Sequence, residues 1–270
     1  MLPYKTLYIY EIQGHFPRPE ETFSDGFIGC WYEADYSFLF FSSPNSEEVQ
    51  RKISAFPELI FRSETILDYK NWETGRDFTS FQVGKFFIFP FWERVEVPQG
   101  LIPIKLDPGV VFGSGCHATT RKCLEGIEYI YQDNVLETVL DLGCGTGILS
   151  IAAAKLGATK IFAVDCNNLA VKTARKNITI NKVEEVVEVI EGDAVHWANQ
   201  EADFVCANID SRTIEKLLDI PGFYNKKWYM LSGMFGTEVN LIKEKLKDFP
   251  LSLVKILQEN FWFTLIGKRN

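Results

Sequence analysis

A glycine-rich turn between a strand and a helix constrains the fold of this chain more than any other feature. Val139 to Leu142 is an apolar run that predicts a buried strand, and Ile148 begins a helix-like segment. Gly143, Gly145 and Gly147 lie between them. Because glycine has no Cβ, the backbone can turn sharply here and lie directly against a ligand. The turn indicates a ligand-binding loop, with a purely structural strand-to-helix connection as the alternative.

The spacing of the three glycines narrows the class of ligand. They follow the pattern G-x-G-x-G, whereas the dinucleotide fingerprint is G-x-G-x-x-G. The extra step that seats a pyrophosphate at the helix N-terminus is missing. The pattern therefore disfavours a nicotinamide-dependent oxidoreductase, one of the functions open to a strand-turn-helix unit of this kind.

Strand-like and helix-like segments alternate from residue 138 to the C-terminus, which predicts a parallel sheet wrapped by helices. The predicted strands are Thr138–Leu142, Lys160–Val164, Val186–Ile190, Phe204–Ala207 and Trp228–Ser232, with two more around Leu253 and Phe261. Helices are predicted to begin at Ile148, Leu169 and Arg212, and another to run through Leu246. No helix separates the last two strands, so we expect the final strand to be antiparallel to its neighbours.

The N-terminal part of the chain predicts a small α+β domain. Thr6–Tyr10 and Ser37–Phe41 are β-prone runs, and Ser46–Phe56 is a helix candidate. An apolar run, Phe86–Trp92, lies in the segment that follows. We expect a domain over residues 1–60, a connecting segment over 61–105 and a second domain over 106–270.

Composition places the chain among globular proteins with room for two domains. Of its 270 residues, 46% are hydrophobic and 24% are charged, which supplies a sizeable core. No stretch approaches the roughly 18 apolar residues that predict a membrane span, and Met1 to Lys5 does not resemble the start of a signal peptide. The six cysteines contain no Cys-x-x-Cys pair, so no metal site is predicted. We expect a cytoplasmic protein and interpret the glycosylation sequon at Asn177 as chance.

The net charge of the chain indicates which class of binding partner it favours. A net charge of −8 and a pI of about 5.1 oppose the phosphate-driven part of nucleic-acid binding, unless a local basic patch overcomes them. The sequence shows no such patch. These values favour a basic protein or a small molecule as the partner and disfavour nucleic acid.

Polar residues stand at the ends of successive predicted strands. Asp165 follows Gly143 by twenty-two positions, where its carboxylate can accept hydrogen bonds from ribose hydroxyls or cap the next helix. Asp193 follows the third strand and either meets an adenine or belongs to a turn. Asn208 ends the fourth strand. Since ligands of open α/β sheets lie outside the carboxyl ends of the strands, we expect these four residues to line one crevice.

The order of these motifs resembles the class I S-adenosylmethionine-dependent methyltransferases, which share an Asp-Leu-Gly-Cys-Gly-Thr-Gly type of loop, here Asp141 to Gly147. A second stretch, Leu106 to Thr120, looks like the segment that precedes the core in bacterial ribosomal protein L-eleven (L11) methyltransferases. The resemblance covers roughly two hundred residues. It also includes Trp72-Glu73, Pro90 to Glu93, Leu231 to Gly233 and Gly267 to Asn270.

This resemblance implies a Rossmann-like seven-stranded methyltransferase sheet with a small N-terminal α+β domain that recognises the protein substrate. It implies S-adenosyl-L-methionine as cofactor and S-adenosyl-L-homocysteine as product. Asn208 would orient the methionine end or the acceptor amine. The expected cofactor-binding residues are Phe112, Thr120, Asp141, Gly143, Gly145, Gly147, Asp165, Asp193 and Asn208.

Methyl transfer from a sulfonium is an in-line displacement, so the protein mainly aligns donor and acceptor and excludes water. A lysine acceptor, with a reference pKa of about 10.4, must first lose a proton, which an apolar pocket favours. Phe112, Ile209 and Trp262 are candidates to line that pocket. His117 either relays the proton or only packs and hydrogen-bonds within its loop.

Two departures from the family pattern stand near the site. The loop carries Ser114 and Cys116 to Ala118, and Asp210 follows Asn-Ile where an aliphatic residue is usual. Asp210 either reaches the amine pocket or caps the following helix, and we favour the cap.

The resemblance implies protein amine methylation, on lysine side chains or an N-terminal amine, with ribosomal protein L11 as the leading substrate. Another protein lysine target is an alternative. Nucleic-acid methylation is a weaker one, because Ile209 and Asp210 replace the two prolines that follow Asn or Asp in base-amine methyltransferases. A binding module with a relict nucleotide fold is the non-enzymatic alternative. The degree of methylation, the oligomeric state and the orientation of the N-terminal domain stay open.

Overall fold

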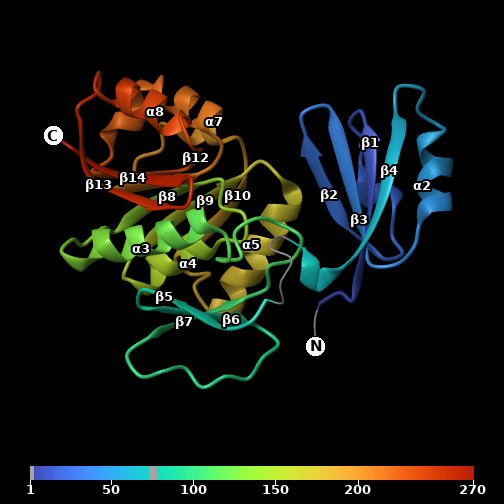
Figure 1. The fold of residues 1–270 in the computed structure, drawn as a ribbon, viewed down its shortest axis with the longest axis horizontal. Coiled ribbons are helices and arrows are strands. Elements are labelled where there is room, and N and C mark those ends of the chain that lie inside the picture. The colour runs from blue at the N-terminus through green and yellow to red at the C-terminus, as the bar shows by residue number, and fades with distance from the viewer. Residues whose placement is uncertain (1–2, 73–77) are drawn as a thin grey trace. The chain divides into compact units, whose positions relative to one another are not determined.

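The computed structural model describes residues 3–72 and 78–270, so Glu73, part of the expected resemblance, lies outside the described residues. The chain forms two compact units, one of Met1–Phe78 with Asn167–Leu169 and one of Thr79–Cys166 with Ala170–Asn270 (Figure 1). We describe each unit by itself. The division at residues 60 and 105 stays a prediction.

The first unit is an antiparallel sheet with a helix packed on it. Its strand order is β2-β3-β1-β4. Tyr10 and Ile12 of β1 pack with Leu39 and Phe41 of β3 in one buried cluster, because alternate residues of a strand share a face. The elements are β1 (Thr6–Gln13), α1 (Pro19–Thr22), β2 (Phe27–Glu33), β3 (Tyr36–Phe41), α2 (Ser46–Ile53), β4 (Ile60–Asp68) and the 3-10 helix η1 (Tyr69–Asn71).

The second unit contains a seven-stranded sheet of order β10-β9-β8-β11-β12-β14-β13. Neighbours from β10 to β12 are parallel, whereas β14 pairs antiparallel with both β12 and β13, which confirms the expected direction of the last strand. The strands are β8 (Thr138–Leu142), β9 (Lys160–Asp165), β10 (Val187–Glu191), β11 (Phe204–Asn208), β12 (Trp228–Phe235), β13 (Leu251–Glu259) and β14 (Trp262–Arg269).

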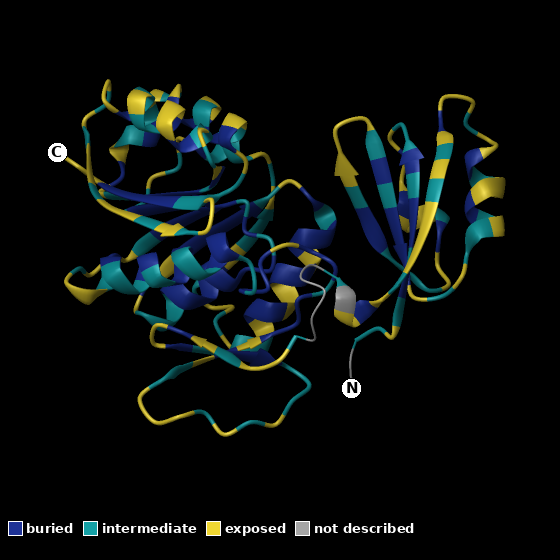
Figure 2. Ribbon diagram, in the orientation of Figure 1, coloured by how far each residue is buried: buried dark blue, intermediate teal, exposed yellow. Residues whose placement is uncertain are grey.

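Helices cover both faces of this sheet, and its central strands are buried, whereas the edge strands β10 and β13 are largely exposed or half-buried (Figure 2). Strands β8 and β11 are almost entirely buried, as expected of central parallel strands that are covered on both sides. The helices are α3 (Ala118–Gln132), α4 (Ile148–Lys155), α5 (Asn168–Asn181), α6 (Ala194–Trp197), α7 (Ser211–Leu218) and α8 (Glu238–Leu246), with the 3-10 helix η2 (Pro221–Asn225). Among the described residues, no helix has the length and apolar character needed to cross a membrane.

The segment expected to connect the domains has regular structure of its own. It forms most of β4 in the first unit and a three-stranded sheet in the second, of order β5-β6-β7. These strands are β5 (Phe81–Val83), β6 (Phe86–Pro90) and β7 (Ile102–Leu106). The apolar run around β6 is the reason, because Phe86 and Ile88 are completely buried and need a packed neighbour.

Candidate active site

The glycine loop between β8 and α4 has no room for side chains at two of its glycines. Gly143, Gly145 and Gly147 all have positive φ, of 75°, 53° and 80°. A Cβ on Gly143 would lie 2.2 Å from Cγ2 of Ile209, and one on Gly145 would lie 2.4 Å from the carbonyl oxygen of Phe112. The predicted loop is thus built by backbone packing that only glycine allows.

The carboxylate of Asp165 faces this loop. Its Oδ2 accepts a hydrogen bond of 2.9 Å from the backbone N–H of Gly145. Asp165 ends β9, which runs parallel to β8, so the end of β9 and the start of the loop lie at the same edge of the sheet. The contact orients a carboxylate beside the glycine backbone.

Asp141 lies beneath the loop and is completely buried. Its Oδ2 accepts a hydrogen bond of 2.6 Å from the Ser150 hydroxyl, and its Oδ1 accepts one of 3.3 Å from the thiol of Cys206. Burial raises the pKa of this carboxyl to about 6, although the two hydrogen bonds act in the opposite direction. From inside the core, Asp141 thus joins β8 to the first turn of α4, on the two sides of the loop, and its contact with the cofactor stays a prediction.

The segment before α3 packs on the glycine loop. The backbone N–H of Thr146 donates to the carbonyl oxygen of Phe112 at 3.1 Å, and its hydroxyl donates to that of Gly113 at 2.6 Å. Asn177 of α5 joins the same two segments, since its Nδ2 donates to the carbonyl oxygens of Asp107 and Thr146 at 2.8 and 2.9 Å. Asn177 is fully buried, which agrees with a chance sequon. No signal in the sequence singled out its bridging role.

Two buried side-chain oxygens near these segments have no hydrogen-bond partner within the part of the chain that the structure describes. They are Oγ1 of Thr120, in the first turn of α3, and Oδ1 of Asn208, at the end of β11. Buried polar atoms are rarely left unsatisfied, because desolvation without a new hydrogen bond costs about 1–3 kcal/mol. Both atoms fit a site in which a polar ligand completes the hydrogen bonding.

His117 caps the helix that carries Thr120. Its Nδ1 accepts a hydrogen bond of 3.3 Å from the backbone N–H of Thr119, and its ring lies 5.1 Å from the ring of Phe112 and 4.9 Å from that of Trp262. Burial, and then the nearby charge of Arg121, lower the pKa of His117. The cap occupies Nδ1, so a neutral ring carries its proton on Nε2. A proton relay through His117 stays a prediction, and this geometry favours the packing alternative.

Two further predicted acids cap helices. Asp193 is exposed, and its Oδ1 accepts from the backbone N–H of Val195 at 2.8 Å at the start of α6. Asp210 accepts from the backbone N–H and the hydroxyl of Thr213, at 3.0 and 2.7 Å, at the start of α7. The cap interpretation of Asp210 is confirmed, and the adenine contact of Asp193 stays a prediction.

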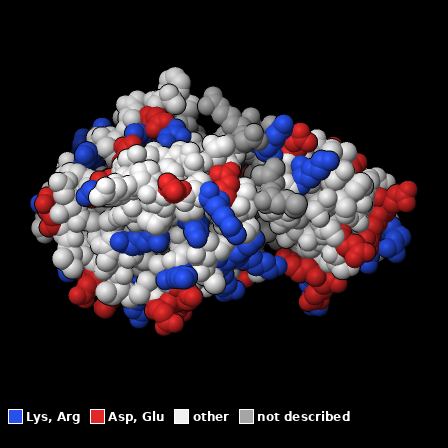
Figure 3. Space-filling view, turned by 90° about the horizontal axis from the view of Figure 1, so that it is seen from below, with Lys and Arg blue, Asp and Glu red and all other residues white. Residues whose placement is uncertain are grey.

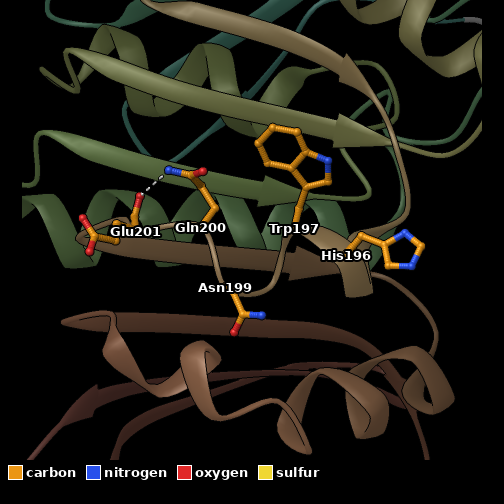
Figure 4. Close-up of a pocket in the computed structure, with 5 residues that line it drawn as sticks. All are labelled: His196, Trp197, Asn199, Gln200 and Glu201. Atoms are coloured by element: carbon orange, nitrogen blue, oxygen red, sulfur yellow. Dashed lines mark hydrogen bonds between the residues drawn. The ribbon is translucent and has the colours of Figure 1, made fainter.

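A surface hollow is lined by His196, Trp197, Asn199, Gln200 and Glu201 (Figure 4). Trp197 projects inward against Phe162, with the ring centroids 6.0 Å apart, while His196 points the other way. Gln200 donates to the carbonyl oxygen of Glu201 at 3.3 Å.

Among the residues that the structure describes, no group of three or more His, Cys, Asp or Glu could hold a metal ion.

Lysine and arginine side chains gather on the side of the second unit where α5 and β7 lie (Figure 3). Lys172, Arg175 and Lys176 are exposed on α5, and Lys105 is exposed on β7. Lys105 also lowers the pKa of the half-buried Lys155 by charge repulsion, after burial itself. The expectation of no basic patch was wrong at this place, where Lys105, from a segment distant in the sequence, joins the three cations of α5; one of these, Lys176, is ion-paired with Asp107.

The strand order, the glycine loop and the polar strand ends together define a class of protein. Strands β8, β9 and β10 follow one another toward one edge of the sheet, and β11 then pairs on the other side of β8. The last strand, β14, is antiparallel and lies between β12 and β13. The carboxyl ends of β8 and β11 meet where the order reverses, which is where open α/β sheets bind ligands. The second unit is a Rossmann-like, seven-stranded methyltransferase domain.

Comparison with known proteins identifies the family. The family model of ribosomal protein L11 methyltransferase (PrmA) matches residues 42–270, and the chain belongs to this family. It is 34% identical to the ribosomal protein L11 methyltransferase of Alkaliphilus oremlandii over 82% of this chain and 74% of that one. It is 33% identical to the one of Caldanaerobacter subterraneus subsp. tengcongensis, over 75% of this chain and 66% of that one.

A solved structure supports the same assignment. The crystal structure of a ribosomal protein L11 methylase from Lactobacillus delbrueckii subsp. bulgaricus superposes with a TM-score of 0.63 at 26% identity. The match covers 71% of this chain and 98% of that one. The resemblance stated from the motifs is thereby confirmed, as is the predicted fold class.

Proposed function

We propose that this chain transfers methyl groups from S-adenosylmethionine to amines of ribosomal protein L11, on lysine side chains or at the N-terminus. Its family membership supports methyl transfer, and the names of its relatives support the substrate. The observation that carries the site is the pair of unsatisfied buried oxygens on Thr120 and Asn208. Both lie among residues expected to contact the cofactor.

The residues at the strand ends fit a ligand with a charged amino-acid end and a ribose. Asp165 would hold the ribose hydroxyls with its carboxylate, which the N–H of Gly145 already orients. Thr120, in the first turn of α3, would donate its hydroxyl to the methionine carboxylate, where the helix dipole also favours negative charge. Asn208 would accept from an ammonium or amine with Oδ1. In this proposal Asp141 acts only through the loop that it supports.

When bound, S-adenosylmethionine supplies a sulfonium methyl group that an amine displaces in line. The chain contributes alignment and exclusion of water. Ile209 packs on the glycine loop, and Phe112 and Trp262 flank the ring of His117. We infer that these apolar side chains line the acceptor pocket, where they disfavour the ammonium form of the acceptor and promote its loss of a proton.

Nucleic-acid methylation remains a second candidate because of the cations on α5 and β7. The sequence after Asn208 opposes it, since Asp210 caps a helix where a base-amine methyltransferase has proline. The acidic net charge of −8 also opposes binding to phosphates.

Calorimetric titration with S-adenosylhomocysteine tests the cofactor part of the proposal. We expect micromolar binding by the wild type and loss of binding by Asp165→Ala, because the variant cannot hold the ribose or orient Gly145. Purified L11 with labelled S-adenosylmethionine then tests the substrate. A folded wild type that does not bind S-adenosylhomocysteine would support the binding-module alternative, and label transferred to RNA instead of L11 would support the second candidate.

A further inference from the structure

A row of aromatic rings leads outward from the candidate active site. The ring of Trp262 lies 4.9 Å from that of His117 and 5.1 Å from that of Phe235, and Phe235 lies 5.8 Å from Phe261. Phe235 ends β12, whereas Phe261 stands in the turn between β13 and β14. We call Phe235 and Phe261 the outer pair. The row is continuous with the site through Trp262.

Both rings of the outer pair are exposed to solvent over about half of their surface or more. Phe261 is 68% exposed and Phe235 is 48% exposed. Contiguous exposed aromatic rings are unfavourable in water and are typical of the energetically important residues of protein interfaces. The pair therefore has the character of a binding surface.

The backbone holds this surface in place. The N–H of Gly236 donates to the carbonyl oxygen of Phe261 at 2.9 Å, and Phe235 faces Trp262 in the pairing of β12 with β14. Glu259, at the start of the turn, forms ion pairs with Arg121 and Lys122 of α3. A rigid aromatic surface loses little conformational entropy when a partner binds.

The charges next to the outer pair favour a polypeptide over a nucleic acid. Glu238 accepts from the backbone N–H of Phe235 at 2.8 Å, which places its carboxylate beside the outer pair. The cations nearby, Arg121 and Lys122, are both paired with Glu259. Single-stranded nucleic acids need cations beside the stacking rings, whereas a lysine-bearing segment is attracted to carboxylates.

We propose that Phe235 and Phe261 bind the polypeptide segment of the protein substrate that flanks the acceptor amine. This inference rests on the proposed function and adds a determinant of substrate affinity outside the methyl-transfer site. The outer pair packs against the substrate backbone and apolar side chains, and Trp262 continues the contact to the acceptor pocket.

Steady-state methyl transfer to purified L11 from labelled S-adenosylmethionine tests the proposal with Phe235→Ser, Phe261→Ser and the double variant. Leu241→Ser on α8 is the matched control, because Leu241 is 65% exposed and Phe261 is 68% exposed. We expect Phe261→Ser to raise KM for L11 about tenfold, with kcat and the affinity for S-adenosylhomocysteine changed less than about twofold. The control should change none of the three. Phe261→Ser keeps the test valid if Phe235→Ser unfolds.

The outcomes separate this proposal from the function on which it rests. A wild type that transfers no methyl group to L11 overturns both. An active wild type whose KM matches that of Phe261→Ser and of the double variant overturns the docking surface alone. The docking surface is also overturned if light scattering shows that the outer pair joins two copies of the chain. It is overturned as well if RNA competes with L11 for the wild type but not for the variants, because the outer pair would then bind RNA.

Discussion

At the scale of single residues, the glycine loop is supported by a carboxyl group that has no access to solvent. Asp141 is completely buried, with Ser150 and Cys206 as its hydrogen-bond donors. Neither partner is a cation, so the ionised carboxylate is not neutralised by an ion pair with them. Its role in holding the glycine loop therefore has a cost in stability that depends on pH.

Replacing Asp141 with Asn should make stability less dependent on pH. Burial raises the pKa of Asp141 to about 6, above its value of about 3.9 in an unfolded chain. The folded state thus binds the proton more tightly than the unfolded state. The stability that this proton binding adds is fully present below the unfolded pKa and is lost as pH rises through 6. We expect the stability of Asp141→Asn relative to wild type to increase by about 1 kcal/mol between pH 5 and pH 8. Urea unfolding at both pH values measures it, and a constant difference would contradict the burial argument.

Gly145 and Gly236 allow a direct test of close packing in the loop. Both have a similar positive φ, of 53° and 57°, but a Cβ on Gly145 would lie 2.4 Å from the carbonyl oxygen of Phe112, whereas Gly236 has nothing within 4 Å. Gly236→Ala should cost about 1 kcal/mol through backbone strain. Gly145→Ala should cost about 2 kcal/mol more and weaken binding of S-adenosylhomocysteine. Thermal unfolding and titration measure both effects, and equal costs would show that the overlap relaxes freely.

At the scale of elements, Arg121 joins three segments around the site. It projects from α3, donates to the carbonyl oxygen of Cys116 in the preceding loop, and pairs with Glu259 at the end of β13. The last contact spans 138 positions of sequence. Arg121 therefore fixes the end of β13, and with it the turn that precedes Trp262, relative to the helix that His117 caps.

Neutralising each partner of this pair should move the pKa of His117 in opposite directions. Arg121 lowers that pKa and Glu259 raises it, while burial is the largest cause of its depression. We expect Arg121→Gln to raise the pKa and Glu259→Gln to lower it further, as measured by NMR titration of the His117 ring. Shifts in the same direction would mean that both substitutions act only by opening the site to water.

The same two variants form a double-mutant cycle for stability. Because both side chains of the pair are about 30% exposed, at 31% and 27%, we expect a coupling energy of only about 1 kcal/mol. The pair Arg51 and Glu48 on α2 is a more exposed control, for which a coupling of about 0.3 kcal/mol is expected. Equal coupling in both cycles would remove the special role of Arg121.

At the scale of the whole molecule, the chain has two compact units with separate cores. Tyr10, Leu39 and Phe41 belong to one buried cluster, and Leu140, Val205 and Ile214 belong to another. The proposed cofactor residues all lie in the second unit. Binding of the cofactor should therefore directly stabilise only the second unit.

Calorimetric unfolding should show this separation. S-adenosylhomocysteine at about 100 times its Kd should stabilise the second unit by about 2.7 kcal/mol, which raises the Tm of its transition by about 5 to 10 °C. The transition of the first unit should stay within about 1 °C of its original position. The Asp165→Ala variant is the control, in which neither transition should move. A shift of both transitions in the wild type would show that the units unfold together.

Local patterns predicted much of the second unit and little of what surrounds its site. The strand Thr138–Leu142 has its predicted bounds, and the direction of β14 follows from the missing helix before it. The strands β2, β4, β5 and β7 were not predicted, because they are short or lack a clear alternation of apolar residues. The loop contacts of Asn177 and the ion pair of Arg121 with Glu259 have no local signal either.

The amino-acid sequence by itself determined the class of fold, the glycine loop and the family, because these depend on residue types at fixed short spacings. Only the tertiary structure decided what each polar residue contacts. It turned Asp141 into a buried support, and it left Thr120 and Asn208 with unsatisfied oxygens. It also brought the exposed Phe235, at the end of β12, together with the exposed Phe261, in the turn between β13 and β14. The physical reason is that hydrogen-bond satisfaction and burial are set by neighbours that are distant in the sequence, which no local pattern encodes.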